Sequence, residues 1–199
     1  MHALNDRVEA LAVAISSELF DGPPGLFPPV RGLVDRVFRG AVRRARPDEL
    51  GPMGLPDQVC RVVSALGAPV SCGDYFAAEP WSFLDAGLRP SGSSSRLRTF
   101  GTGWNDTTAF CLDSETPTVH GVVVQDGRIV DELYVNRDYA TFMAFLCHLR
   151  VLLDVYQQVS VEAYLREVPV VRDHLARLDK DALVDGAWWV GLVEEFDMV

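Results

Sequence analysis

Two pairings of cysteine with histidine are the candidates for nucleophilic catalysis in this sequence. Cys147 and His148 are adjacent in a helical pattern, so their side chains diverge by roughly 100° and do not form a nucleophile–base pair with each other. Cys111 and His120 belong to neighbouring strand-like segments and can approach each other in a hairpin. A catalytic pair also needs an orienting third group and an anion hole, and the sequence indicates neither. Catalysis centred on Cys111 and His120 is therefore an alternative rather than the main hypothesis.

Motifs for phosphates, cofactors or metal ions are not found in the sequence. The segment 101–104, Gly-Thr-Gly-Trp, lacks the lysine and hydroxyl that follow the glycines of a phosphate-binding loop, so we interpret it as a glycine-rich connection between strands. The cysteines form no Cys-x-x-Cys pair, and the histidines lack the spacing of metal ligands. These residues are Cys60, Cys72, Cys111, Cys147, His2, His120, His148 and His174. The sequence therefore predicts no enzyme, no cofactor and no metal site, and it favours reduced structural thiols.

Acidic side chains cluster around the ends of the predicted strands. Aspartate is a preferred turn residue, so one interpretation is ordinary turn and surface chemistry. A second, compatible interpretation is an acidic rim that steers a basic partner. In this second interpretation the partner-binding residues are the acids together with a neighbouring tryptophan: Trp81, Trp104, Asp106, Asp113, Asp126, Asp131 and Glu132.

The composition is typical of a globular protein with an acidic surface. The chain has 199 residues, of which 48% are hydrophobic, so it is long enough for one domain with a substantial core. Its formal net charge of −10 argues against nucleic-acid binding, which needs a basic face, and favours a basic protein partner. No apolar run approaches the roughly 20 residues that span a bilayer, and the N-terminus lacks a signal-peptide pattern. These features predict a cytoplasmic protein that binds neither nucleic acid nor membranes.

The elements that must position these residues are short strands followed by one long helix, between Leu97 and Leu153. Turn signals separate the strands, and Asp126-Gly127 is the strongest hairpin signal among them. After Asn136, a good N-cap residue, apolar residues recur at spacings of three and four, which predicts a helix packed on the sheet. The predicted strands are residues 96–100, 107–112, 120–124 and 129–135, and the helical face is Tyr139, Phe142, Leu146, Leu149, Leu153 and Tyr156.

Helices are also predicted before and after this block. Apolar spacing indicates helices at residues 4–20, 30–45 and 56–66, the last of which ends at Gly67. Helical structure is expected again from residue 161 to 199, with a break near Pro169 and an apolar anchor that includes Trp188 and Trp189.

The predicted helix at 30–45 carries arginines at helical spacing, which form a local exception to the acidic balance. Three interpretations stay open: a solvated face, contact with acidic segments of the same protein, and, against the overall charge, nucleic-acid binding. The arginines of this face are Arg36, Arg39, Arg43 and Arg46.

Two motifs and the strands between them carry a family resemblance. The first motif is residues 55–61, Leu-Pro-Asp-Gln-Val-Cys-Arg, followed by Leu66-Gly67-Ala68-Pro69, and the second is residues 134–146, which begins Tyr-Val-Asn-Arg-Asp-Tyr. The predicted strands lie between the two motifs in the same order as in the family. The family's C-terminal helix has its counterpart in residues 178–183 and in the paired tryptophans Trp188 and Trp189. Over about residues 47–196 this pattern resembles the SUKH superfamily of immunity proteins, most closely its fourth immunity subfamily. The chain departs from the family at two positions. Ala68 stands where the family's Gly-Leu-Pro motif has leucine, and Arg137 stands where serine is common.

The resemblance implies an α+β fold with a mainly antiparallel sheet flanked by helices. Residues 1–46 would be an N-terminal helical extension and residues 47–199 the SUKH-like domain. It further implies a bacterial immunity protein of a polymorphic-toxin system, one that binds and neutralises its cognate toxin, often a nuclease or nucleic-acid deaminase, without catalytic residues. The acidic charge fits this role because such toxins are commonly basic. A regulatory or scaffold module of the same fold that binds a non-toxin protein is the alternative.

Overall fold

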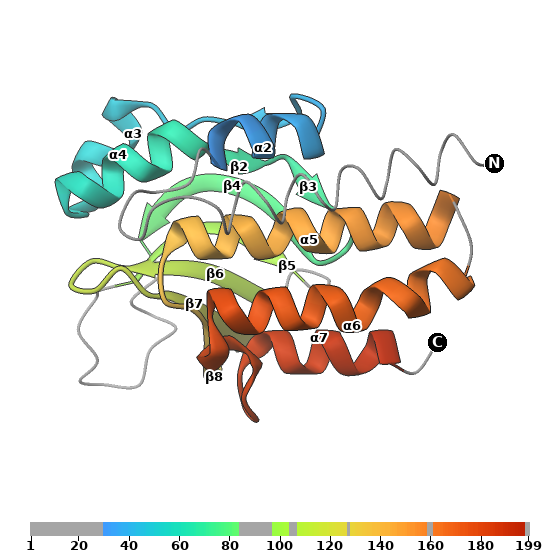
Figure 1. Ribbon diagram of the computed structural model, residues 1–199. Helices are drawn as coiled ribbons and strands as arrows, with labels where there is room; N and C mark the ends of the chain where they lie inside the picture. Colours follow the sequence, from blue (N-terminus) through green and yellow to red (C-terminus); the bar gives the residue numbers. More distant parts are fainter. Residues whose placement is uncertain (1–29, 84–96, 104–106, 127, 159–160, 198–199) are drawn as a thin grey trace.

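The computed structural model describes residues 30–83, 97–103, 107–126, 128–158 and 161–197 (Figure 1). The helix predicted at residues 4–20 lies outside these residues. Within them the chain forms an antiparallel sheet and a set of helices, so the expected α+β class with a mainly antiparallel sheet is confirmed.

A six-stranded antiparallel sheet forms one layer of the molecule. Its strands follow one another in space as they do in the sequence, and the hairpins predicted from the turn signals are confirmed. Sequence reasoning missed the first two strands, the second of which contains Pro80 and shows no regular alternation of apolar and polar residues. The strands are β3 (Ser71–Cys72), β4 (Phe76–Phe83), β5 (Leu97–Gly103), β6 (Thr108–Asp113), β7 (Val119–Gln125) and β8 (Arg128–Asn136).

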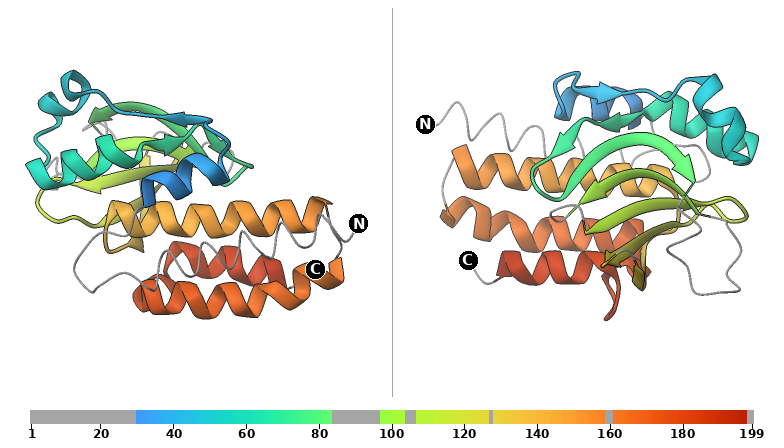
Figure 2. Two further views of the ribbon diagram at one scale, coloured as in Figure 1. Left: turned by 45° about the horizontal axis from the view of Figure 1, so that its top comes forward. Right: turned by 180° about the vertical axis from the view of Figure 1, so that it is seen from behind.

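Helices α5 (Tyr139–Gln158), α6 (Val161–Leu178) and α7 (Trp188–Asp197) lie together on one face of this sheet. The view from behind in Figure 2 places the strands in front of them. A second group of elements lies beside β4 and against α5. It consists of α2 (Val30–Val37), α3 (Pro47–Leu50), α4 (Asp57–Leu66) and a small sheet of β1 (Val42–Arg43) with β2 (Ala68–Pro69). Short 3-10 turns follow α3 at Gly51–Met53 and α6 at Lys180–Leu183.

The core is built around α5, and its centre is the ring of Phe142. This ring lies 5.5 Å from that of Phe76, 5.6 Å from Phe100 and 5.2 Å from Phe110, all measured between centroids. Successive side chains of a strand point to opposite faces of the sheet. The three phenylalanines of β4, β5 and β6 all point to the face that α5 covers, so their rings converge on Phe142. Burial of each such ring stabilises the fold by roughly 2–3 kcal/mol. The prediction that the apolar face of α5 packs on the sheet is confirmed.

The glycines of β5 are strand residues, so the interpretation of segment 101–103 as a connection is wrong. A Cβ at Gly101 would collide with the ring of Phe76 on the neighbouring strand, and one at Gly103 would collide with the backbone of Tyr75. These glycines therefore allow β4 and β5 to approach closely, where any side chain would separate them.

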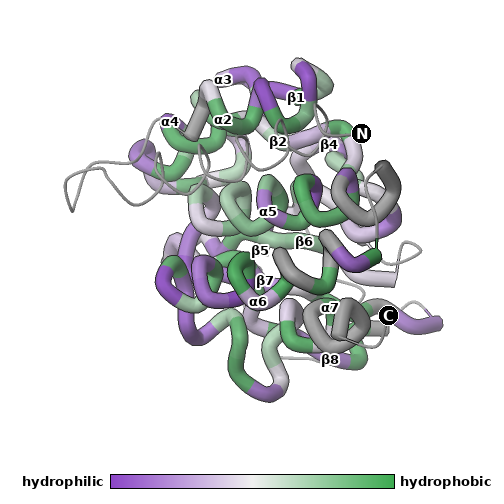
Figure 3. The backbone as a smooth tube through the Cα atoms, turned by 45° about the vertical axis from the view of Figure 1, so that its right-hand side comes forward, coloured by the Kyte–Doolittle hydropathy of each residue, from purple (hydrophilic) through white to green (hydrophobic). Residues whose placement is uncertain are grey.

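The predicted helix at 30–45 ends early, at Val37. Arg39 and Gly40 have positive φ values of 53° and 77°, which stops the helix and leads into β1. The arginines therefore do not form one helical face. Instead Arg43 lies 3.1 Å from Glu49, Arg44 lies 2.7 Å from Asp35, and Arg46 lies 3.3 Å from Asp48. Of the predicted face, Arg43 and Arg46 contact acids of the same protein, in the hydrophilic region around α3 and β1 (purple in Figure 3), whereas Arg36 and Arg39 are exposed.

Two further local predictions are wrong. The helix α6 continues through Pro169, because Val168, Val171 and Leu175 hold it against the core on both sides of the proline. Asn136 is not the N-cap of α5. Its side chain is buried, and Asp138 accepts the Thr141 N–H at 2.7 Å instead. The apolar anchor near the C-terminus is confirmed for Trp188, Trp189 and Leu192, which are all buried.

Candidate functional site

Of the two tryptophans expected to contact a partner, Trp81 lies within the described residues. Trp81 on β4 is half-buried and stacks on Phe100, with centroids 5.3 Å apart and ring planes inclined by 26°. It therefore contributes mainly to the core and presents only part of its surface. Trp104 and Asp106 lie outside the described residues.

Asp113, the next predicted contact, is only 3% exposed. Its carboxylate accepts the Glu115 N–H at 2.8 Å, and its own N–H donates to the Thr118 carbonyl at 3.1 Å. These bonds are typical of a turn in which aspartate replaces a backbone acceptor. Asp113 therefore shapes the loop between β6 and β7 rather than forming part of an exposed acidic surface.

The remaining predicted acids, Asp126, Asp131 and Glu132, are exposed and lie on the β7–β8 hairpin. Strand β8 is an edge strand of the sheet. Asp131 and Glu132 are adjacent in sequence, and the Asp131 carboxylate accepts the Glu132 N–H at 2.8 Å. We call Asp126, Asp131 and Glu132 the hairpin acids. They give this edge of the molecule a negative charge that a basic protein would meet.

Cys111 and His120 are directly paired across β6 and β7, so the expected approach of the two strands is confirmed. The sheet also supplies a carboxylate, since Glu132 Oε1 lies 3.2 Å from His120 Nδ1. The thiol, however, has no exposed surface and lies against the Thr99 hydroxyl and the Ala109 carbonyl. It belongs to a small apolar cluster with Leu97 and Val122. Because a substrate cannot reach this sulfur without a movement of the sheet, the arrangement supports a structural role for Cys111.

A groove of about 230 Å³ opens where three separate segments meet. One wall is the start of α4, the other is the β6–β7 loop, and the floor is the start of α5. We call it the α4 groove. It is lined by Pro56, Gln58, Val59 and Val62, by Glu115, Thr116 and Pro117, and by Asp138, Tyr139 and Ala140.

The position of the groove walls is fixed by buried hydrogen bonds. The hydroxyl of Tyr139, on the floor, donates to the carbonyl oxygen of Gly67 at the end of α4, at 3.0 Å. Burial raises the pKa of this phenol well above its usual value, so it stays protonated and remains a donor. Asp138 caps α5, and Asp113 fixes the loop opposite. The groove is therefore a preformed feature of the fold.

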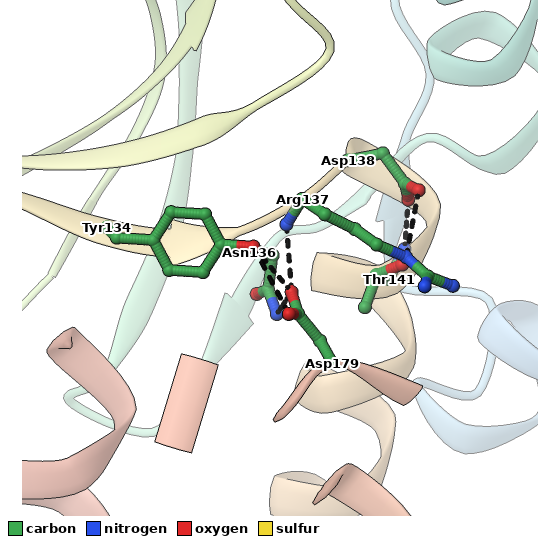
Figure 4. A network of polar contacts seen from close by, with 6 residues as sticks. All are labelled: Tyr134, Asn136, Arg137, Asp138, Thr141 and Asp179. Carbon is green, nitrogen blue, oxygen red and sulfur yellow. Dashed lines mark hydrogen bonds and ion pairs between the residues drawn. The ribbon is translucent and has the colours of Figure 1, made fainter. Parts of the chain in front are cut away.

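A polar network behind the groove joins β8 to the C-terminal helices (Figure 4). The buried Asp179 carboxylate accepts bonds from the Tyr134 hydroxyl at 3.0 Å, the Asn136 amide at 3.3 Å and the Arg137 N–H at 2.8 Å. Asn136 in turn accepts the indole N–H of Trp189 at 2.9 Å. Burial, and then the charge of Asp179, raise the pKa of Tyr134. Asn136, which belongs to the second family motif, thus helps to hold helix α7 and the turn before it against the sheet.

The described residues contain neither a metal-ligand cluster nor a helix that could cross a membrane. No three or more histidine, cysteine, aspartate or glutamate side chains gather there as they would around a metal ion. None of the helices in this part of the chain has both the length and the apolar character needed to cross a membrane. Cys72, Cys111 and Cys147 are buried and carry reduced thiols. For Cys72, burial raises the pKa to about 12, which makes its thiol a poor nucleophile.

Comparison with known proteins identifies the family. No curated protein and no solved structure matches the chain. A family model described as SUKH-4 immunity protein matches residues 30–195. This range begins at α2, whose Leu33 and Val34 are fully buried in the same core as α5, and it includes the α4 groove, the hairpin acids and the Asp179 network. The chain therefore belongs to the SUKH-4 immunity protein family.

Proposed function

We propose that this protein is an immunity protein that binds a cognate bacterial toxin in the cytoplasm and neutralises it by protein–protein contact. The observation that carries the proposal is the match of the SUKH-4 immunity model over residues 30–195. Immunity to toxins is the general function of this family. The particular toxin class proposed, a basic nuclease or nucleic-acid deaminase, follows from the resemblance together with the acidic charge of the chain.

The charge distribution supports a basic partner. The chain has a formal net charge of −10, and the hairpin acids are exposed at an edge of the sheet. The net charge already includes the arginines of the segment around β1, which lie against acids of the same chain. Complementary charge accelerates the encounter of two proteins and rejects partners of the same sign. We propose that the hairpin acids steer the toxin toward the immunity protein.

Inhibition in solution tests the proposal. The toxin encoded beside this chain is purified, and its nuclease or deaminase turnover is measured while this protein is titrated into it. Activity should fall linearly to near zero at a fixed molar ratio, because tight binding blocks one toxin with each complex formed. An albumin of similar net charge serves as the control for nonspecific binding of a basic protein. Full toxin activity in the presence of excess folded protein would exclude neutralisation by contact.

A further inference from the structure

The size of the α4 groove suits a protein side chain better than a small-molecule ligand. Its volume of about 230 Å³ lies below the range of roughly 300–1,000 Å³ that is usual for small-molecule and cofactor sites. Anchor residues at protein interfaces occupy pockets of this smaller kind, where one well-packed side chain contributes much of the binding energy.

The lining of the groove is apolar at its centre. Tyr139 and Ala140 form a buried floor, and the half-buried Val59 and Val62 on α4 line the groove beside them. The proline ring of Pro117 contributes to the opposite wall. The Tyr139 hydroxyl is bonded to Gly67, so the floor offers mainly hydrocarbon surface to an occupant. An aliphatic or aromatic side chain would therefore gain the usual free energy of burial there.

The rim of the groove is acidic. Glu115 lies on the loop side and Asp138 on the α5 side, and Asp57 is exposed in the first turn of α4 next to the groove. Arg137 lies 3.5 Å from the Asp138 carboxylate and offsets its charge, so Glu115 on the loop side and Asp57 on the α4 side carry the negative charge of the rim. A segment that places lysine or arginine beside its apolar side chain would meet charges of opposite sign on both sides of the groove.

We propose that the α4 groove is a docking site for a basic segment of the toxin, which inserts one apolar side chain between α4 and the β6–β7 loop. This inference rests on the proposed function, and adds to it the place and the chemistry of the contact. The hydrogen bonds of Tyr139, Asp138 and Asp113 hold the walls in place before any partner binds. Binding therefore costs little conformational entropy in this protein.

The test uses matched substitutions in the full chain and the catalytically inactivated toxin encoded beside it, with affinity measured by calorimetry. Val59→Phe places a ring in the groove and should weaken binding at least tenfold. Val70→Phe makes the same change at a residue that is 56% exposed outside the groove, and should leave the affinity unchanged.

A second pair of variants tests the acidic rim. Glu115→Lys should weaken binding several-fold, whereas Glu79→Lys, on the exposed surface of β4, should not. Melting temperatures confirm that each variant is folded, and Thr116→Phe on the exposed loop replaces Val59→Phe if that variant does not fold.

A photo-crosslinking residue at Thr116 identifies the occupant directly. The proposal predicts crosslinks to a toxin peptide in which lysine or arginine flanks an apolar residue, while the same crosslinker at Asp173 on α6 gives none. Wild-type affinity in the groove variants, or crosslinks to a neutral or acidic peptide, would overturn the docking site and leave the proposed function intact. A wild-type protein that binds no toxin would overturn both.

Discussion

The hydroxyl of Tyr139 donates a hydrogen bond to the carbonyl oxygen of Gly67, at 3.0 Å, across 72 residues of sequence. Tyr139 begins α5, and Gly67 ends α4 with a φ of 68°. This bond therefore joins the floor of the α4 groove to the helix that forms one of its walls. The geometry of Gly67 is consequently part of the geometry of the candidate site.

Gly67→Ala should lower the free energy of unfolding more than Gly40→Ala does. Both glycines have positive φ, 68° and 77°, so alanine costs about 1 kcal/mol at either position from backbone strain. A Cβ at Gly67 would also lie 2.7 Å from the Arg43 carbonyl oxygen, whereas nothing lies within 4 Å of one at Gly40. We expect a total loss of about 3 kcal/mol at Gly67. Urea denaturation measures the free energy of unfolding of both variants. Equal losses would contradict the close approach of the β1 backbone to Gly67.

Asp179→Asn should destabilise the protein by about 2 kcal/mol, because an amide cannot accept all the hydrogen bonds that the carboxylate accepts from Tyr134, Asn136 and Arg137. Asp181→Asn, an exposed position in the same 3-10 turn, removes the same charge and provides the control. It should change stability by less than about 0.5 kcal/mol. Thermal or urea unfolding compares the two. If the effects are alike, the network in Figure 4 contributes no specific stabilisation.

Stability should fall as the pH is lowered, partly because of His148. Burial lowers the pKa of this imidazole to about 4, and its Nδ1 lies 2.8 Å from the Ala144 carbonyl oxygen. In the unfolded chain the pKa is near 6.5, so between these two values the unfolded state binds more protons than the folded state. The contribution is complete above pH 6.5 and is lost as the pH falls toward 4, with about 2 kcal/mol lost by pH 5.

The variant His148→Gln separates this effect from other titrations. Glutamine retains an N–H donor for the Ala144 carbonyl but does not titrate. The free energy of unfolding is measured in urea between pH 8 and pH 5 for both proteins. The advantage of the wild type over the variant should shrink by about 2 kcal/mol over this range. Parallel curves would show that His148 is not the titrating group.

Reversal of two hairpin acids should slow association with the toxin. The double variant Asp131→Lys/Glu132→Lys should reduce the association rate about tenfold at low salt, because steering depends on the summed field of exposed charges. The same two reversals at Asp173 and Asp185, which are exposed elsewhere, serve as the control. Stopped-flow mixing at several salt concentrations makes the measurement. An unchanged rate in the hairpin variant would show that the hairpin acids do not steer the toxin.

Sequence patterns predicted the elements whose signals are local. The β6–β7 and β7–β8 hairpins follow from turn residues, and α5 from apolar spacing, since these patterns depend on neighbours within a few residues. Asn136 shows the limit of such reasoning. Its type and position suggested a helix cap, yet its side chain bonds Trp189, which is 53 residues away. The tertiary contact replaced the local one, and nothing in the neighbouring residues indicates it.

The candidate site was less predictable than the fold. The α4 groove combines residues 56–62, 115–117 and 138–140, which no periodicity connects. The family motif contained Pro56, Val59 and Gly67, but a motif does not tell which of its residues lines a surface. Asp113 was predicted to contact a partner because it is an acid near a strand end. Its burial and its bond to the Glu115 N–H show that it shapes the β6–β7 loop instead. Sequence reasoning placed the hairpin acids on the β7–β8 hairpin, where they lie exposed, and their contact with a partner stays a prediction.

Protection of living cells is the strongest test of the proposed immunity function. The toxin encoded beside this chain is induced in a sensitive bacterium with this protein, with the Val59→Phe variant, or with an empty vector, at matched expression levels. The account predicts that the wild-type protein restores colony numbers to those of uninduced cells, and that it gives no protection against an unrelated toxin. Equal killing with and without the folded wild-type protein would contradict its function as the immunity partner of that toxin.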